Sequence, residues 1–181
     1  MIENIIAYLF RVLGWKISNV EIGKSVQKAV FAVGPHTSNW DFFLGLAVRK
    51  VYGIPTRFLA KESLFRFPLG GVMRWLGGYP VDRRSSHGLV DQVVGIFNRE
   101  PHFLLTIAPE GTRSKVEEIK SGFYYIARQA KVPIIPVTFD YAKKEVRFYP
   151  PIPPDTPKEQ VIDKVTALFR QARGKHPEKG M

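Results

Sequence analysis

Short apolar runs alternate with amphipathic segments along most of this chain. The apolar runs, bounded by glycine, proline and polar residues, predict strands over residues 26–33, 55–60, 79–82, 103–107, 132–139 and 145–149. Apolar residues at helical spacing predict helices from Asn39 or Asp41 to residue 50 and over residues 68–76, 85–98, 122–130 and 158–172. This alternation predicts an α/β fold, a single domain whose mostly parallel central sheet is covered by helices on both faces.

The two ends of the chain follow different patterns. Apolar residues recur at helical spacing near the start and predict a short amphipathic N-terminal helix, which would either lie on a membrane or pack on the domain: Ile2, Ile5, Ile6, Leu9, Val12 and Leu13. At 1.5 Å per residue this helix is about 20 Å long, too short to cross a bilayer. We therefore expect a membrane-associating helix over residues 1–14, one domain over residues 15–173, and a flexible polar tail over residues 174–181.

Charge narrows the class of partner. The chain has 27 Lys and Arg against 16 Asp and Glu, a formal net charge of +11, which favours either nucleic acid or an anionic membrane surface. No helix-turn-helix, zinc-finger or RNA-binding signature is present, and many of the basic residues are interspersed with aromatic ones, so we expect a membrane and no nucleic acid. The absence of cysteine excludes disulfides, thiolate zinc sites and a cysteine nucleophile, and we expect no metal.

A histidine and an aspartate lie five residues apart where a predicted strand ends. His36 follows the strand over residues 26–33, and Asp41 lies at or near the start of the next helix. Imidazole accepts a proton near neutral pH, and a neighbouring carboxylate fixes its tautomer and raises its basicity. The pair predicts transfer of a group to a hydroxyl with the imidazole as general base. Taken alone, the spacing is also common by chance.

Two further segments offer groups that suit an anion. The loop after the strand over residues 103–107 reads Pro109-Glu110-Gly111-Thr112-Arg113-Ser114-Lys115, with a glycine, hydroxyls and two cations. Arg83 follows the strand over residues 79–82, and guanidinium groups match phosphate geometry. The alternatives are an ordinary polar turn and a surface ion pair with Asp82. In parallel sheets the strand ends meet at one edge, so we expect His36, Arg83 and Glu110 to lie there together.

Four segments, in this order, resemble the sequence blocks of the glycerolipid acyltransferases of the 1-acylglycerol-3-phosphate acyltransferase type. His36 to Asp41 matches the family's His-x4-Asp block, and Gly78 to Arg83 is similar to its arginine-ending second block. Residues 109–114 look like the third block and residues 132–137 like the proline-flanked fourth. The resemblance covers roughly residues 30–140.

The resemblance implies a role for each matching residue and a set of partners. His36 would deprotonate the acceptor hydroxyl and Asp41 would orient its imidazole. The donor would be acyl-CoA or an acyl carrier protein thioester, used as a co-substrate without any other cofactor. The enzyme would act in phospholipid biosynthesis as a peripheral protein on the cytoplasmic face of the cell membrane, with a lysophospholipid such as 1-acylglycerol-3-phosphate as acceptor. The acceptor's phosphate would contact Arg83, Glu110, Gly111, Thr112 and Arg113.

Two departures from the family's usual residues leave the acceptor open. Pro35 stands where the family often has asparagine, and Ala108 where it commonly has an aromatic residue. A different lysolipid, for example one based on an amino acid, therefore remains an alternative acceptor. The other alternative is a non-catalytic basic domain that binds membranes or nucleic acid.

Overall fold

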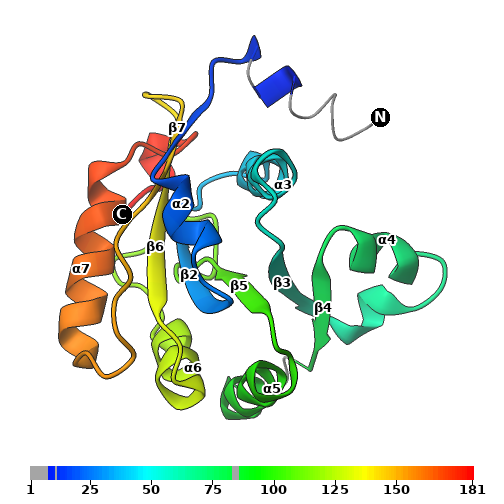
Figure 1. The fold of residues 1–181 in the computed structure, drawn as a ribbon. Coiled ribbons are helices and arrows are strands. Elements are labelled where there is room, and N and C mark those ends of the chain that lie inside the picture. Colours follow the sequence, from blue (N-terminus) through cyan, green and yellow to red (C-terminus); the bar gives the residue numbers. More distant parts are fainter. Residues whose placement is uncertain (1–7, 11, 83–85) are drawn as a thin grey trace.

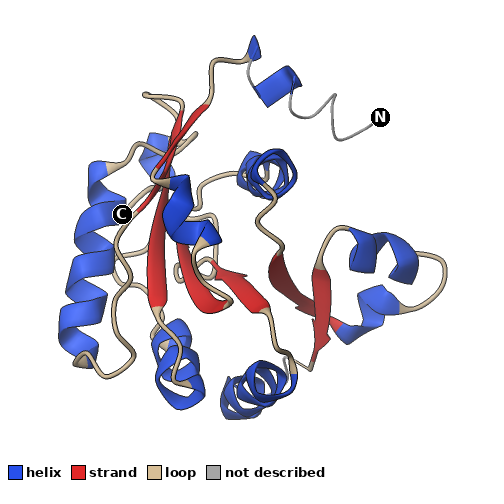
Figure 2. Cartoon of the chain, viewed as in Figure 1, coloured by secondary structure: helices blue, strands red, loops and turns tan. Residues whose placement is uncertain are grey.

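The structure is a computed structural model that describes residues 8–10, 12–82 and 86–181. Within these residues the strands form one seven-stranded sheet with helices packed on both sides (Figures 1 and 2). The strands are β1 (Lys16–Ser18), β2 (Lys28–Gly34), β3 (Thr56–Lys61), β4 (Gly78–Val81), β5 (Phe103–Ile107), β6 (Ile134–Asp140) and β7 (Glu145–Phe148). The α-helices are α2 (Val20–Lys24), α3 (Trp40–Tyr52), α4 (Gly70–Trp75), α5 (Ser86–Arg99), α6 (Gly122–Ala130) and α7 (Lys158–Gln171).

The sheet is mostly parallel, as the sequence predicted. Its strand order is β1-β7-β6-β2-β5-β3-β4, and the five strands from β6 to β4 run parallel. Only the pairing between β6 and β7 is antiparallel among the described strands. β2 lies at the centre of the sheet, where Val30 is aligned with Leu105 of β5 and with Ile134 of β6. The residues that follow β2 therefore emerge at the middle of the sheet edge.

Alternating side chains of β2 build the two halves of the core. Val30 and Ala32 face the side covered by α5, α6 and α7, where they join Phe97, Phe123 and Phe169. Ala29, Phe31 and Val33 face the opposite side, where α3 contributes Leu44, Ala47 and Val48. A strand buried on both faces reads as a continuous apolar run, and this explains the uninterrupted apolar sequence of β2.

Two parts of the fold differ from the predicted pattern. β1 and α2 were not predicted, because both are too short to show a clear hydrophobic period. The helix predicted over residues 68–76 is shorter, and a 3₁₀ turn, η1 (Glu62–Phe65), precedes it. Figure 1 shows η1 and α4 standing away from the sheet beside β4, the edge strand. We call residues 62–77 the β3–β4 excursion.

The ends of the chain also carry structure. At the N-terminus, the structure describes helical backbone at residues 8–10 and 12, and Phe10 packs against Trp15 and Tyr52. None of the described helices is both long and apolar enough to cross a membrane. The C-terminal segment, residues 172–181, contains the tail predicted over residues 174–181. It lies against the domain, with a 3₁₀ turn, η2 (Pro177–Lys179), and Met181 against the core.

Candidate active site

The loop between β2 and α3 is organised by one buried carboxylate. Asp41, in the first turn of α3, is only 3 % exposed. Its Oδ2 accepts hydrogen bonds from the backbone N–H groups of Thr37 and Ser38, both at 2.9 Å. The same oxygen lies 3.0 Å from Nδ1 of His36. Asp41 therefore fixes the backbone of the loop and the direction of the imidazole together.

These contacts determine which nitrogen of His36 can act as a base. A carboxylate only accepts hydrogen bonds, so the proton of a neutral imidazole lies on Nδ1 and the lone pair on Nε2. The side chain of His36 is 23 % exposed, which leaves the ring accessible from solvent. An imidazole held in this tautomer can take a proton at Nε2, while Asp41 stabilises the resulting imidazolium.

Tyr141 makes a further contact with Asp41. Its hydroxyl donates to Oδ1 of Asp41 at 2.7 Å, across 100 residues of sequence. Burial, and then the hydrogen bond and the charge of Asp41, raise the pKa of Tyr141 above its ordinary value. The phenol therefore stays protonated and remains a donor. Tyr141 directly follows β6, so a strand-end position, the signal that selected His36 and Glu110, would have found it.

Glu110 lies against the same loop, as the strand-edge argument predicted. Its Oε2 accepts the backbone N–H of His36 at 2.7 Å, and the residue is 3 % exposed. Burial raises the pKa of Glu110, and the hydrogen bond from the His36 backbone opposes that effect only in part. Its other oxygen, Oε1, is buried without a hydrogen-bond partner among the described residues.

The Glu110 loop then turns outward. Gly111 has a φ of 67°, a backbone conformation that other residues rarely adopt, so the turn favours glycine. Thr112 and Arg113 are exposed beyond it. The structure thus brings His36, Asp41 and Glu110 together, with residues 111–113 adjoining them. Arg83, the remaining predicted site residue, lies outside the described residues.

A groove of about 680 Å³ separates this exposed loop from the start of α3. One wall is formed by residues 37–40 and another by residues 112–114. The C-terminal segment supplies three further lining residues, which the sequence reasoning missed because nothing in the tail indicated where it folds: Lys175, His176 and Lys179. The described residues contain no cluster of three or more side chains suited to a metal ion.

The chain is similar in sequence to known proteins. The 1-acyl-sn-glycerol-3-phosphate acyltransferase of Escherichia coli K12 is 32 % identical over 112 residues, which cover 58 % of this chain and 44 % of that protein. The protein of the same name from Saccharomyces cerevisiae is 30 % identical over 133 residues, which cover 69 % of this chain and 43 % of the relative. The chain therefore spans less than half the length of these relatives.

A solved structure shares the fold. The crystal structure of the 1-acyl-sn-glycerophosphate acyltransferase PlsC from Thermotoga maritima superposes with a TM-score of 0.65 at 20 % identity, over 94 % of this chain and 76 % of that one. A sequence model described as Acyltransferase matches residues 16–140, which include the His36–Asp41 loop and the Glu110 loop. Because this match covers more than half of the chain, the protein belongs to the acyltransferase family.

Proposed function

We propose that the protein transfers a fatty acyl group from an acyl thioester, acyl-CoA or acyl carrier protein, to a hydroxyl of a lysophospholipid such as 1-acylglycerol-3-phosphate. The observation that carries the proposal is the His36–Asp41 pair. Its Nδ1–Oδ2 distance of 3.0 Å, its two supporting amides and its partly exposed ring meet the requirements of a general base. The names of the sequence relatives suggest the acceptor.

The chemistry needs little beyond a base and correct positioning. In the proposed reaction, Nε2 of His36 takes the proton of the acceptor hydroxyl as its oxygen attacks the thioester carbonyl carbon. The tetrahedral intermediate then expels the thiolate, which recovers the proton from the imidazolium, so ester and free thiol leave together. A thioester is already activated, and general-base assistance typically contributes about 10²- to 10⁴-fold.

In this proposal the acceptor's phosphate binds beside the base. Arg113 and Thr112 line the same groove as residues 37–40, and Gly111, with its positive φ, forms the turn between them and Glu110. Arg113 offers charged donors suited to phosphate oxygens. Arg83 is proposed as a further phosphate ligand on sequence grounds alone.

We also propose that the protein works as a peripheral protein on the cytoplasmic face of the cell membrane. A net charge of +11 favours an anionic leaflet. Large apolar side chains are exposed along the β3–β4 excursion and suit insertion at the lipid interface. The exposed members are Leu64, Phe67, Leu69, Val72 and Trp75.

An acceptor panel with one acyl thioester tests the reaction. Wild type is expected to release thiol with 1-acylglycerol-3-phosphate, and His36→Ala is expected to lose about 10²-fold or more of kcat with its circular dichroism unchanged. Thiol release is measured with a thiol reagent and the ester product by mass spectrometry. Equal turnover in His36→Ala contradicts the base assignment. Turnover only with an amino-acid-based lysolipid contradicts the proposed acceptor.

A further inference from the structure

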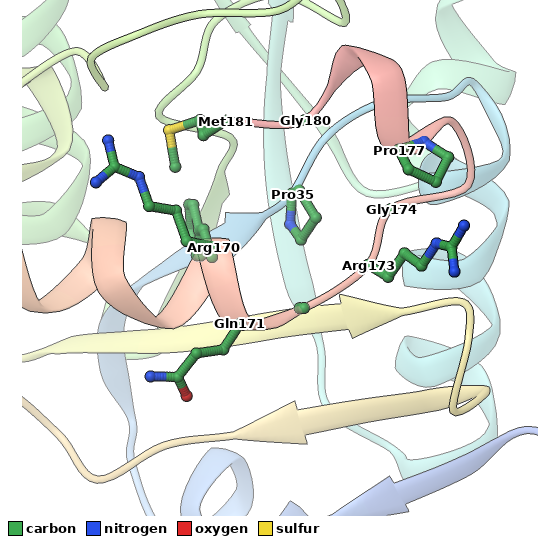
Figure 3. Close-up of a pocket in the computed structure, with 10 residues that line it drawn as sticks. Pro35, Arg170, Gln171, Arg173, Gly174, Pro177, Gly180 and Met181 are labelled. Carbon is green, nitrogen blue, oxygen red and sulfur yellow. The ribbon is translucent and has the colours of Figure 1, made fainter.

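The C-terminal segment is fastened to the loop that carries the proposed base. The backbone N–H of His176 donates to Oγ1 of Thr37 at 3.2 Å, and the N–H of Tyr141 donates to the carbonyl of Arg173 at 2.8 Å. Gly174 packs so closely that a Cβ there would lie 2.6 Å from Thr37 Oγ1. Figure 3 shows the segment leaving the end of α7 at Gln171, passing Gly174 and Pro177, and returning at Met181, around Pro35.

This docking carries positive charge to the groove beside His36. The amino nitrogen of Lys175 lies 4.4 Å from the centre of the Trp40 ring, so its position is held by a cation–π contact. Lys175 and Lys179 line the same groove as Arg113. None of the ten described lining residues is acidic, and the segment's own Glu178 lies 3.6 Å from Nδ1 of His176.

Three cations and several hydroxyls on one groove have the chemistry that suits a phosphate group. Thr37, Ser38, Thr112 and Ser114 line the groove between the cations and offer neutral donors. Lysine and arginine contribute charge-assisted hydrogen bonds to phosphate oxygens, which are about twice as strong as neutral ones. The groove volume of about 680 Å³ is ample for a phosphate together with the polar part of a larger substrate.

Resting on the proposed function, we infer that Lys175 and Lys179 bind, together with Arg113, a phosphate group of one of the two substrates. The group is either the phosphomonoester of the acceptor or a phosphate of the coenzyme A carrier. Both lysines lie outside residues 16–140, the part of the chain that the family shares. They therefore extend the site beyond the region that the family model matches.

Binding without turnover tests this inference. The variant Lys175→Gln/Lys179→Gln removes both charges at similar length, and Lys175→Arg/Lys179→Arg restores them. Lys164→Gln on α7, an exposed lysine that does not line the groove, is the control for loss of a positive charge elsewhere on the surface. Isothermal titration calorimetry with glycerol 3-phosphate and with coenzyme A measures Kd, and glycerol and pantetheine serve as the phosphate-free counterparts.

We expect the double Gln variant to raise Kd about tenfold or more for one phosphate-bearing probe, with the Arg pair and Lys164→Gln close to wild type. A higher Kd for glycerol 3-phosphate assigns the site to the acceptor, and a higher Kd for coenzyme A assigns it to the donor. Unchanged Kd values for both probes, no binding of either probe by wild type, or an equal loss in Lys164→Gln overturn the inference.

A separate turnover measurement keeps this result apart from the proposed reaction. If wild type transfers no acyl group but the double Gln variant still weakens phosphate binding, the proposed function fails and the inference stands. If wild type transfers acyl groups but the substitutions at Lys175 and Lys179 leave every Kd and KM unchanged, the proposed function stands and the inference fails.

Discussion

In the loop after β2, the carboxylate of Asp41 is buried and accepts four hydrogen bonds, whereas in the β3–β4 excursion the large side chains face solvent. Phe67 is 100 % exposed, and only Phe65 is buried among the aromatic residues of the excursion. Arg74 lies over the ring of Phe65, and Arg66 is exposed beside it. In the loop after β2, nearly all polar groups are hydrogen-bonded within the protein. The β3–β4 excursion has apolar side chains that no other described part of the chain covers.

The difference separates two physical tasks. A base must be held in one orientation before the substrate arrives, which requires donors and acceptors fixed by the surrounding fold. A membrane-binding surface gains free energy only when its apolar groups leave water, so it must be exposed beforehand. Substitutions in the first region should change rate, and those in the second should change partition between water and membrane.

Asp41→Asn should have the largest effect. The amide keeps one oxygen for the Thr37 and Ser38 amides but loses the negative charge that stabilises the imidazolium, so kcat should fall by about 10²-fold or more. Steady-state kinetics measure the loss, and vesicle binding should remain as in wild type. A variant that loses vesicle binding in parallel would contradict the separation of the two regions.

Phe67→Ser/Leu69→Ser should weaken vesicle binding and leave the rate of acyl transfer unchanged. Each side chain contributes up to about 1.5–3 kcal/mol when it leaves water completely, so partial insertion predicts a loss of about tenfold in partition to vesicles rich in anionic lipid. Sedimentation with vesicles measures partition. Tyr125→Ser, at an exposed aromatic of α6, is the control. Turnover on a water-soluble short-chain thioester and acceptor should be unchanged. A large fall in this turnover would contradict the separation of the two regions.

Tyr141→Phe should give a smaller change confined to the rate. It removes the donor to Oδ1 of Asp41 while keeping the ring that packs against Trp15. The loss of one hydrogen bond to a charged group, about 1.5–3 kcal/mol at most, predicts a fall in kcat of several-fold or more with KM little changed. An unchanged kcat would show that Tyr141 only packs.

Glu110→Gln tests the buried carboxyl that holds the His36 backbone and whose Oε1 has no hydrogen-bond partner among the described residues. A carboxyl whose pKa is raised by folding binds its proton more tightly in the folded state, so its stabilising contribution is present at low pH and is lost as pH rises through the raised pKa. From the ordinary glutamate pKa of about 4.3 upward, wild type should lose stability relative to Glu110→Gln. Urea unfolding across this range measures the difference, and parallel curves would contradict it.

The sequence predicted the parts of this molecule that repeat a simple pattern. The apolar run of β2 and the positions of His36 and Glu110 after two strands sufficed to predict a parallel sheet and a shared edge, because strand ends meet by geometry. The position of Tyr141 after a strand was open to prediction, but its contact with Asp41, like that of Lys175 with Trp40, depends on strand order and on where the chain returns. The β3–β4 excursion was predicted only as a helix. The exposure of its apolar side chains was not predicted, because it depends on which other parts of the fold pack against them.

The backbone N–H of Tyr141 gives direct access to the state of the C-terminal segment. This amide donates to the carbonyl of Arg173, and its own side chain holds Asp41. Its hydrogen therefore exchanges with deuterium only when the segment lifts away. The deuterium-exchange rate of the Tyr141 amide therefore reports how often the C-terminal segment detaches, without any substrate present.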